Sequence, residues 1–150
     1  MNTAIFPGSF DPYTRGHHDI VVRSLTLFDK VIVGIGFNSK KNKRYFEVDW
    51  MVEKIKKAHD DNPKLEVIVY DELTAELAKK YDARFLIRGL RNTTDFEYEN
   101  SISQVNRYLN TELETVFLIT TPEFAHISSS IIREVHKYGG DVSPFLPYQI

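Results

Sequence analysis

A strand, a turn-rich loop and a helix follow one another near the start of the chain, and this order restricts the fold more than any other feature. Residues 4–6 are apolar and stop at Pro7-Gly8, which predicts a short buried strand. Beyond Gly16, apolar residues recur at helical spacing and predict an amphipathic helix. These residues are Ile20, Val21, Leu25 and Phe28. A buried strand that leads into a helix is typical of α/β folds.

His17 falls in the first turn of this predicted helix. Free backbone N–H groups and the positive end of the helix dipole meet there, so the position favours an anion such as a phosphate. The alternative is that Gly8 and Gly16 form an ordinary turn and that His17 is solvated. Both interpretations fit this segment taken by itself.

The composition indicates one hydrophobic core. The 150 residues are 42% hydrophobic, so we expect a single domain over residues 1–150. The net charge of −2 argues against a general nucleic-acid-binding protein, which normally carries a basic surplus. The absence of cysteine excludes a disulfide framework and a thiolate zinc site. No segment approaches the roughly 20 apolar residues of a membrane span, so we expect no membrane partner and a cytoplasmic location.

Apolar runs and amphipathic segments alternate along the rest of the chain. Further strands are predicted at 31–36, 65–70, 85–87 and 115–119, and helices are predicted between them and after the last. Nearly continuous apolar strands are typical of parallel sheets that are covered on both faces. The sequence therefore predicts an α/β fold, a Rossmann-like, doubly wound five-stranded parallel sheet with helices on both faces.

Four loops follow strands and would meet at one edge of such a sheet, where open α/β sheets bind ligands. They span residues 7–17, 37–45, 88–94 and 120–130. The second loop is rich in lysine, and the third carries Arg88 and Arg91, whose guanidinium groups suit phosphate. Basic runs are often solvated, and these arginines have Asp95 and Glu97 nearby as ion-pair partners. One anion site nevertheless explains the loops better than unrelated surface features do.

Two helix starts near these loops allow alternative interpretations. Asp95 is predicted to cap a helix with an apolar stripe, and Glu99, off that stripe, is either surface or an acceptor for a nucleotide's ribose or adenine. The stripe consists of Tyr98, Ile102, Val105 and Leu109. Ser128, Ser129 and Ser130 open the last helix and suit either capping or phosphate binding.

The motifs resemble those of a known superfamily. The string G-S-F-D-P at residues 8–12, followed by T-R-G-H at 14–17, is similar to the nucleotidylyltransferase signature. The blocks at 87–91, 95–99 and 127–130 resemble, in order and spacing, the bacterial phosphopantetheine adenylyltransferases. The resemblance implies a nucleotidylyltransferase domain over residues 1–150. It implies that ATP and 4′-phosphopantetheine, with Mg²⁺, give dephospho-coenzyme A and pyrophosphate by direct in-line displacement without a covalent intermediate.

The resemblance also assigns roles to individual residues. It implies that His17 is catalytic and stabilises the transition state at the α-phosphate. The residues implied to bind the acceptor are Ser9, Lys41, Thr74 and Arg88. Those implied to bind ATP are Ser9, Phe10, His17, Gly89, Leu90, Arg91, Glu99, Phe124, Ala125, His126, Ile127, Ser128, Ser129 and Ser130. No metal held by the protein is expected, since adjacent side chains such as His17 and His18 point about 100° apart on a helix.

Some assignments stay open at the level of sequence. The basic loop is one residue longer than in the family, so counting from Asn38 selects Lys41, whereas Lys40 and Lys43 remain alternatives. Thr74 and the segment 49–51 also depart from the family pattern. The resemblance implies a homohexamer with the helix of Asp95 near an interface, and feedback inhibition by coenzyme A. The alternative functions are adenylyl transfer to another phosphate monoester and a non-catalytic nucleotide sensor.

Overall fold

The computed structural model describes residues 1–40 and 43–150. The strands are β1 (Thr3–Gly8), β2 (Lys30–Gly36), β3 (Leu65–Tyr70), β4 (Phe85–Leu90) and β5 (Glu114–Ile119). The helices are α1 (Arg15–Leu27), α2 (Val48–Ala58), α3 (Thr74–Lys80), α4 (Thr93–Leu109) and α5 (Ser129–Lys137), with 3₁₀ turns η1 (Pro122–Phe124) and η2 (Ser143–Phe145). Each predicted strand is present, and β4 continues three residues further than expected, so Arg88 and Gly89 lie within it.

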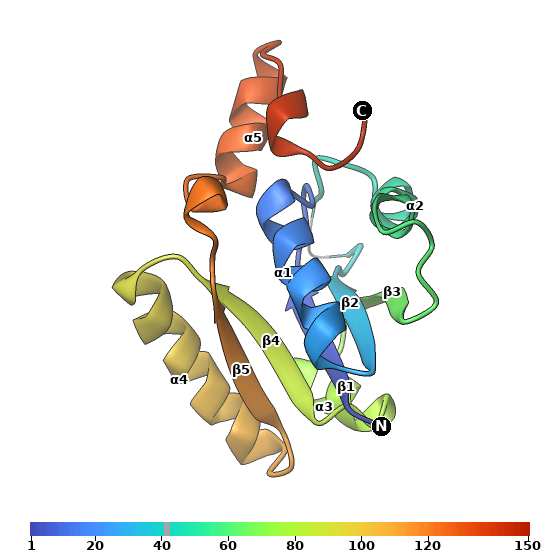
Figure 1. Cartoon of the computed structure of the whole chain (residues 1–150), viewed down its shortest axis with the longest axis vertical. Coiled ribbons are helices and arrows are strands. Elements are labelled where there is room, and N and C mark those ends of the chain that lie inside the picture. The colour runs from blue at the N-terminus through green and yellow to red at the C-terminus, as the bar shows by residue number, and fades with distance from the viewer. Residues whose placement is uncertain (41–42) are drawn as a thin grey trace.

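The five strands form one parallel sheet in the order β3-β2-β1-β4-β5 (Figure 1). From β1 the chain adds β2 and β3 on one side of the sheet, and it then crosses to the other side of β1 to add β4 and β5. These two strands pair at Ala4 with Phe85 and at Ile5 with Leu86, whereas β1 and β2 pair along their whole length, from Thr3 with Lys30 to Gly8 with Ile35. The carboxyl ends of β1 and β4 therefore lie at a topological switch point, where ligands bind in such sheets.

Helices cover both faces of the sheet, as predicted. Residues such as Phe6 and Val33 face one side and form a core with α1 and α2. The alternate residues Ile5 and Ile32 face the other side and pack with α3. This alternation follows from the two-residue period of a strand, because both faces are buried here.

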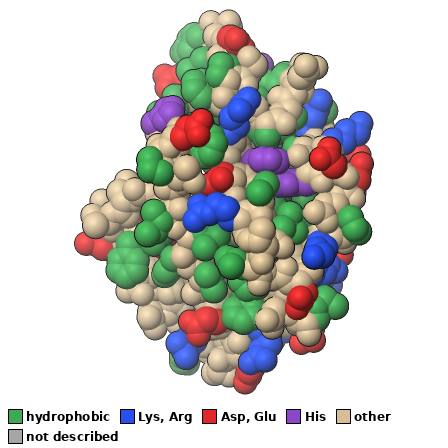
Figure 2. Space-filling model, viewed as in Figure 1, with side chains coloured by type: hydrophobic (Ala, Val, Ile, Leu, Met, Phe, Trp, Pro, Cys, Tyr) green, Lys and Arg blue, Asp and Glu red, His purple; other side chains and the backbone are tan. Residues whose placement is uncertain are grey.

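The α4 helix corrects two expectations. Asn92, not Asp95, caps it, since the Asn92 side chain accepts a hydrogen bond of 2.8 Å from the Asp95 amide. Its predicted apolar stripe is largely exposed, with Tyr98 at 67% and Val105 at 58%, and Glu99 is its buried residue. Figure 2 shows hydrophobic side chains over the part of this face that α4 occupies. The stripe therefore does not belong to the core of this chain.

The last residues pack against α5, the loop before α1 and the start of α2. Val142 and Leu146 pack with Ile132 of α5 in a small separate core around η2. The Tyr148 hydroxyl then donates a hydrogen bond of 2.7 Å to the carbonyl of Tyr13, so the tail holds the loop before α1. Among residues 1–40 and 43–150, no helix has both the length and the apolar character that a membrane crossing requires.

Candidate active site

A cavity of about 320 Å³ opens at the carboxyl ends of β1 and β4. The start of α1 and the segment from η1 to α5 form its other walls. The start of α1 packs beside η1, where a Cβ added at Gly16 would lie 3.7 Å from the Phe124 Cβ, in ordinary van der Waals contact. Its polar lining residues are Ser9, Thr14, His17, Arg88, Arg91, Asp95, Glu99, Thr120, Ser128 and Ser129.

His17 is fixed by the loop that precedes its helix. Its Nδ1 accepts a hydrogen bond of 3.0 Å from the Thr14 amide, while its own amide donates to the Thr14 hydroxyl. This reciprocal capping means that Nδ1 carries no proton, so the neutral ring carries its proton on Nε2. Burial, reinforced by the charges of Arg88 and Arg91, lowers the pKa of His17 to about 4. The cavity therefore contains a neutral hydrogen-bond donor.

Arg88 and Glu99 form the central ion pair of the site. The Arg88 Nε and Nη2 atoms each lie 2.7 Å from one oxygen of the Glu99 carboxylate, which is a two-pronged pairing. The remaining Nη1 donates to the carbonyl of Pro7 on β1. Glu99 is 7% exposed, so it is not helix surface, and the partner of Arg88 is Glu99 rather than Asp95 or Glu97. The pair orients the Arg88 guanidinium at the sheet edge.

Arg91 and the serines complete the cavity rim. The Arg91 side chain, more exposed than Arg88, pairs with Asp95 at 3.1 Å, as the ion-pair alternative expected. Ser128 is the residue before α5, yet its side chain makes no capping hydrogen bond. The Ser129 hydroxyl donates 2.8 Å to the carbonyl of Pro12. Capping therefore does not explain Ser128, whose side chain lies at the cavity beside the free N–H groups of α5.

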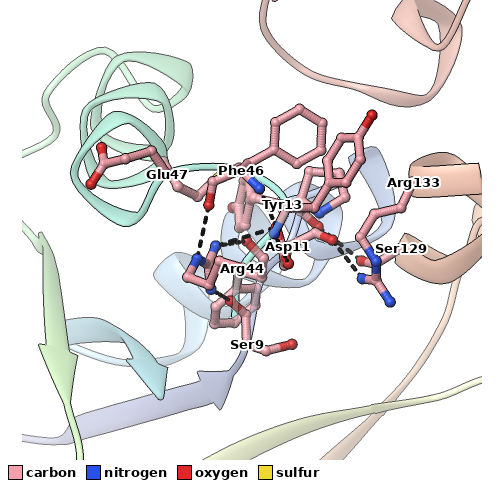
Figure 3. Close-up of polar contacts among 12 residues, drawn as sticks. Ser9, Asp11, Tyr13, Arg44, Phe46, Glu47, Ser129 and Arg133 are labelled. Carbon is pink, nitrogen blue, oxygen red and sulfur yellow. Dashed lines mark hydrogen bonds and ion pairs between the residues drawn. The ribbon is translucent and has the colours of Figure 1, made fainter. Parts of the chain in front are cut away.

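Arg44 joins the basic loop to the loop that carries Ser9 (Figure 3). Its guanidinium donates to the carbonyls of Ser9, Phe10 and Phe46, and its side chain is 6% exposed. The Asp11 carboxylate accepts hydrogen bonds of 2.9 and 2.8 Å from the backbone amides of Tyr45 and Phe46. We call this arrangement the Arg44–Asp11 clamp. Arg44 is therefore a structural residue and not a solvated charge.

The structure distributes the predicted site residues as follows. Those that line the cavity are Ser9, Phe10, His17, Arg88, Gly89, Arg91, Glu99, Phe124, Ile127, Ser128 and Ser129. Those outside its lining are Leu90, Ala125, His126 and Ser130. Phe10 is 3% exposed, its ring packs against Phe6 and its carbonyl accepts a hydrogen bond from Arg44, so little of this residue is open to a ligand. Lys41 lies outside the described residues.

Thr74 lies in an adjoining cavity of about 210 Å³ between β4, α3 and α4. Arg88 and Glu99 line both cavities, so the two are neighbours across this ion pair. The Thr74 hydroxyl lies 2.9 Å from that of Tyr70. The lining of this second cavity mixes polar side chains with apolar ones such as Leu86 and Ile102.

Sequence patterns did not indicate a third and wider hollow, of about 830 Å³, between the basic loop and α5. Lys43, Arg133 and Lys137 line it, and Ser9 lines both this hollow and the cavity of His17. Lys43, one of the alternatives to Lys41, therefore faces a cationic space next to the site. Arg133 was missed because it occurs singly within a helix, where nothing in the sequence separates it from surface charge.

The carboxylates near the cavity are already engaged by protein donors. Asp11 holds two amides, Asp95 pairs with Arg91, and Glu99 pairs with Arg88. Across the part of the chain that the structure describes, no cluster of three or more His, Cys, Asp or Glu side chains has metal-ligand geometry. A divalent ion at this site would therefore be held by phosphate oxygens and water, which is how Mg²⁺ usually accompanies a nucleotide.

Together these groups can hold two anions and stabilise charge that forms between them. Cations and hydroxyls line both the cavity and the hollow, whereas no strong base with a raised pKa lines the cavity of His17 among the described residues. Such a site suits a reaction whose nucleophile is already ionised, as a phosphate is. Phosphoryl or nucleotidyl transfer has this requirement.

Comparisons with known proteins agree with this chemistry. A family model described as cytidylyltransferase-like matches residues 5–135. Phosphopantetheine adenylyltransferase of Cytophaga hutchinsonii is 65% identical over 147 residues, which cover 98% of this chain and 97% of that protein. The protein of the same name from Bacteroides fragilis is 47% identical, with coverage of 98% and 97%.

Solved structures share the fold at low sequence identity. Two structures of a bifunctional NMN adenylyltransferase/ADP ribose pyrophosphatase from Francisella tularensis match with TM-scores of 0.75 and 0.69 at 14% identity. They cover 98% and 99% of this chain, which spans 45% of that longer protein. The second was determined in complex with AMP and a manganese ion.

Proposed function

The chain belongs to the cytidylyltransferase-like family and, within it, to the phosphopantetheine adenylyltransferases, and from this premise we propose how it works. It transfers the adenylyl group of ATP to 4′-phosphopantetheine and forms dephospho-coenzyme A and pyrophosphate. An oxygen of the acceptor phosphate forms a bond to the α-phosphorus of ATP. The bond from the α-phosphorus to the oxygen that bridges to the β-phosphate breaks, and pyrophosphate leaves with that electron pair.

The observation that carries this proposal is the neutral imidazole of His17 at the sheet edge, next to two arginines. Its Nε2–H stabilises the charge that builds on the α-phosphate oxygens, and it does so without giving up a proton. Arg88, held by Glu99, meets the acceptor phosphate, and the pantetheine arm follows the cavity that contains Thr74. Arg91 and Ser128 meet the phosphates of ATP. The residues thus bring two anions into line and offset their repulsion.

The carboxylates at the cavity pair with arginines or amides, so Mg²⁺ would arrive as a complex with ATP rather than be held by the protein. When bound, it would neutralise part of the triphosphate charge. We further propose that the protein acts in the cytoplasm, assembles as a homohexamer with α4 near an interface, and responds to coenzyme A as an inhibitor.

The test is pyrophosphate release from ATP with 4′-phosphopantetheine, for the wild type and His17→Ala. Loss of one oxyanion-type donor lowers kcat by about a hundredfold or more. ATP binding by calorimetry should change little, since the donor acts chiefly in the transition state. His136→Ala, which alters another partly buried histidine on α5, should keep normal turnover.

Two outcomes would redirect the proposal. If the wild type turns over ATP only with a different phosphate monoester, the acceptor assignment is wrong and the reaction class stands. If it binds ATP and releases no pyrophosphate with any acceptor, a nucleotide sensor replaces the enzyme.

A further inference from the structure

A chain of aromatic contacts connects His17 to the far end of α2. The Tyr13 ring lies nearly parallel to the His17 ring, with centroids 5.6 Å apart and an angle of 27°. The Tyr13 hydroxyl lies 2.6 Å from Nε2 of His59, the residue that ends α2. We propose that Tyr13 and His59, here called the Tyr13–His59 brace, are positioning residues that set the orientation of the His17 imidazole. This inference rests on the proposed function of His17.

The brace begins with a buried polar group that needs a partner. Tyr13 is 0% exposed and His59 is 8% exposed, so neither can exchange its hydrogen bond for one with water. Because the hydroxyl is tethered to α2, the Tyr13 ring cannot slide along its neighbour. The backbone of Tyr13 is held as well, by the Tyr148 hydroxyl at 2.7 Å. Tyr13 is therefore fixed at both ends.

The brace restrains the one motion that His17 retains. Its Nδ1 is pinned by the Thr14 amide, which leaves a tilt of the ring about that hydrogen bond. Phe10 meets the ring edge-on with centroids 4.9 Å apart and an interplanar angle of 85°, and Tyr13 lies along its face. Between them they fix the direction of Nε2–H. A displacement of about 1 Å in a catalytic group costs up to about a hundredfold in rate.

His18 closes the chain of contacts back onto α1. Its ring stacks on that of His59 with centroids 4.3 Å apart and an angle of 20°. Burial lowers the pKa of both rings, so at pH 7 they are neutral and can stack without charge repulsion. The Nδ1 atom of His18 is buried without a hydrogen-bond partner among the described residues. His18, the residue after His17 on α1, therefore packs against His59 and links the brace to α1.

The test compares Tyr13→Phe and His59→Phe with the conservative variant His59→Gln. The first two keep an aromatic ring and remove the hydrogen bond, whereas glutamine keeps a group that can bond the Tyr13 hydroxyl. We expect kcat for pyrophosphate release to fall about tenfold in both phenylalanine variants, with KM values within twofold, and to recover in His59→Gln. The double variant Tyr13→Phe/His59→Phe should be no slower than either single one, since both changes remove one interaction.

Asn110→Ala is the matched control for lost stability. It removes a buried hydrogen bond of 3.2 Å from Asn110 to the Ala75 carbonyl, and Asn110 ends α4 just before β5 begins, at the opposite edge of the sheet from His17. It should lower the melting temperature and leave kcat unchanged. Nitrogen-15 spectra of the His17 ring supply a readout that does not need turnover, because a ring that tilts about its Nδ1 hydrogen bond broadens the Nε2 signal in Tyr13→Phe but not in the wild type or control.

The outcomes separate the brace from the proposed function. If both phenylalanine variants keep kcat within twofold of the wild type, or lose no more than Asn110→Ala, the brace is wrong. If the wild type itself shows no turnover, the proposed function fails, and the His17 spectra then decide on the brace alone. Unchanged His17 spectra in Tyr13→Phe and in His59→Phe would overturn it.

Discussion

At the scale of single residues, the lowered pKa values of His17 and His59 make the stability of the protein depend on pH. Burial lowers the pKa of His17 to about 4, helped by Arg88 and Arg91, and lowers that of His59 to about 4, helped by His18. In the unfolded chain both groups have their ordinary pKa of 6.5. Between these values the unfolded state binds more protons than the folded state. The stability that the two neutral rings contribute is therefore complete above pH 6.5 and is lost as the pH falls toward 4.

We therefore expect the free energy of unfolding in urea to be lower at pH 5 than at pH 7. His59→Gln removes one of the groups that titrate in this window, so the difference between the two pH values should shrink. An equal difference in the wild type and His59→Gln would show that His59 does not titrate in this window.

At the scale of elements, the Arg44–Asp11 clamp joins the basic loop to the turn between β1 and α1. Phe10 in that turn has a φ of 45°, a left-handed conformation that a bulky residue adopts only when its surroundings hold it. Arg44→Met removes the donors to the Ser9 and Phe10 carbonyls and leaves Asp11 without its cation. We expect a loss of about 3 kcal/mol in the free energy of unfolding, measured in urea.

Lys43→Met is the control for this change, since Lys43 is the exposed neighbour of Arg44. It should leave unfolding within about 0.5 kcal/mol of the wild type, as surface substitutions usually do. If both variants unfold alike, Arg44 does not act as a clamp.

The elements also show what sequence patterns can and cannot predict. The strands and most helices were predictable because apolar runs that are buried on both faces leave a clear periodic signal. The α4 helix was misread because its apolar side is exposed in this chain and its buried side carries Glu99, whose burial depends on Arg88 from another element. A cap at Asn92 rather than Asp95 depends on loop geometry that spacing does not specify.

The site shows the same limit. His17 and Arg88 could be placed from the order of strands and loops, because parallel strands bring their carboxyl ends together. The contact of Tyr13 with His59 joins residues 46 positions apart and leaves no local pattern. The Arg44–Asp11 clamp could not be predicted either, because Arg44 follows a run of lysines that is typical of a solvated surface.

At the scale of the whole molecule, the exposed apolar face of α4 is where the proposed hexamer would bury surface. Light scattering after size exclusion should give six times the 17.4 kDa mass of one chain. Val105→Asp places a charge in this face and should reduce the mass, because an unpaired charge is costly in an interface. Val22→Asp, on the exposed side of α1, is the control and should keep the wild-type mass. A monomeric wild type would contradict the hexamer.

The sparse pairing of β1 with β4 has a consequence for how the protein responds to its nucleotide. In the described strands these neighbours pair at two positions and then part, and Arg88 reaches across the opening to Pro7. The sheet is therefore open between β1 and β4 at the edge that holds the site. His17 follows β1 on one side of this opening, and Arg91 follows β4 on the other. A nucleotide that contacts both sides bridges this opening, so nucleotide binding should also hold β1 and β4 together.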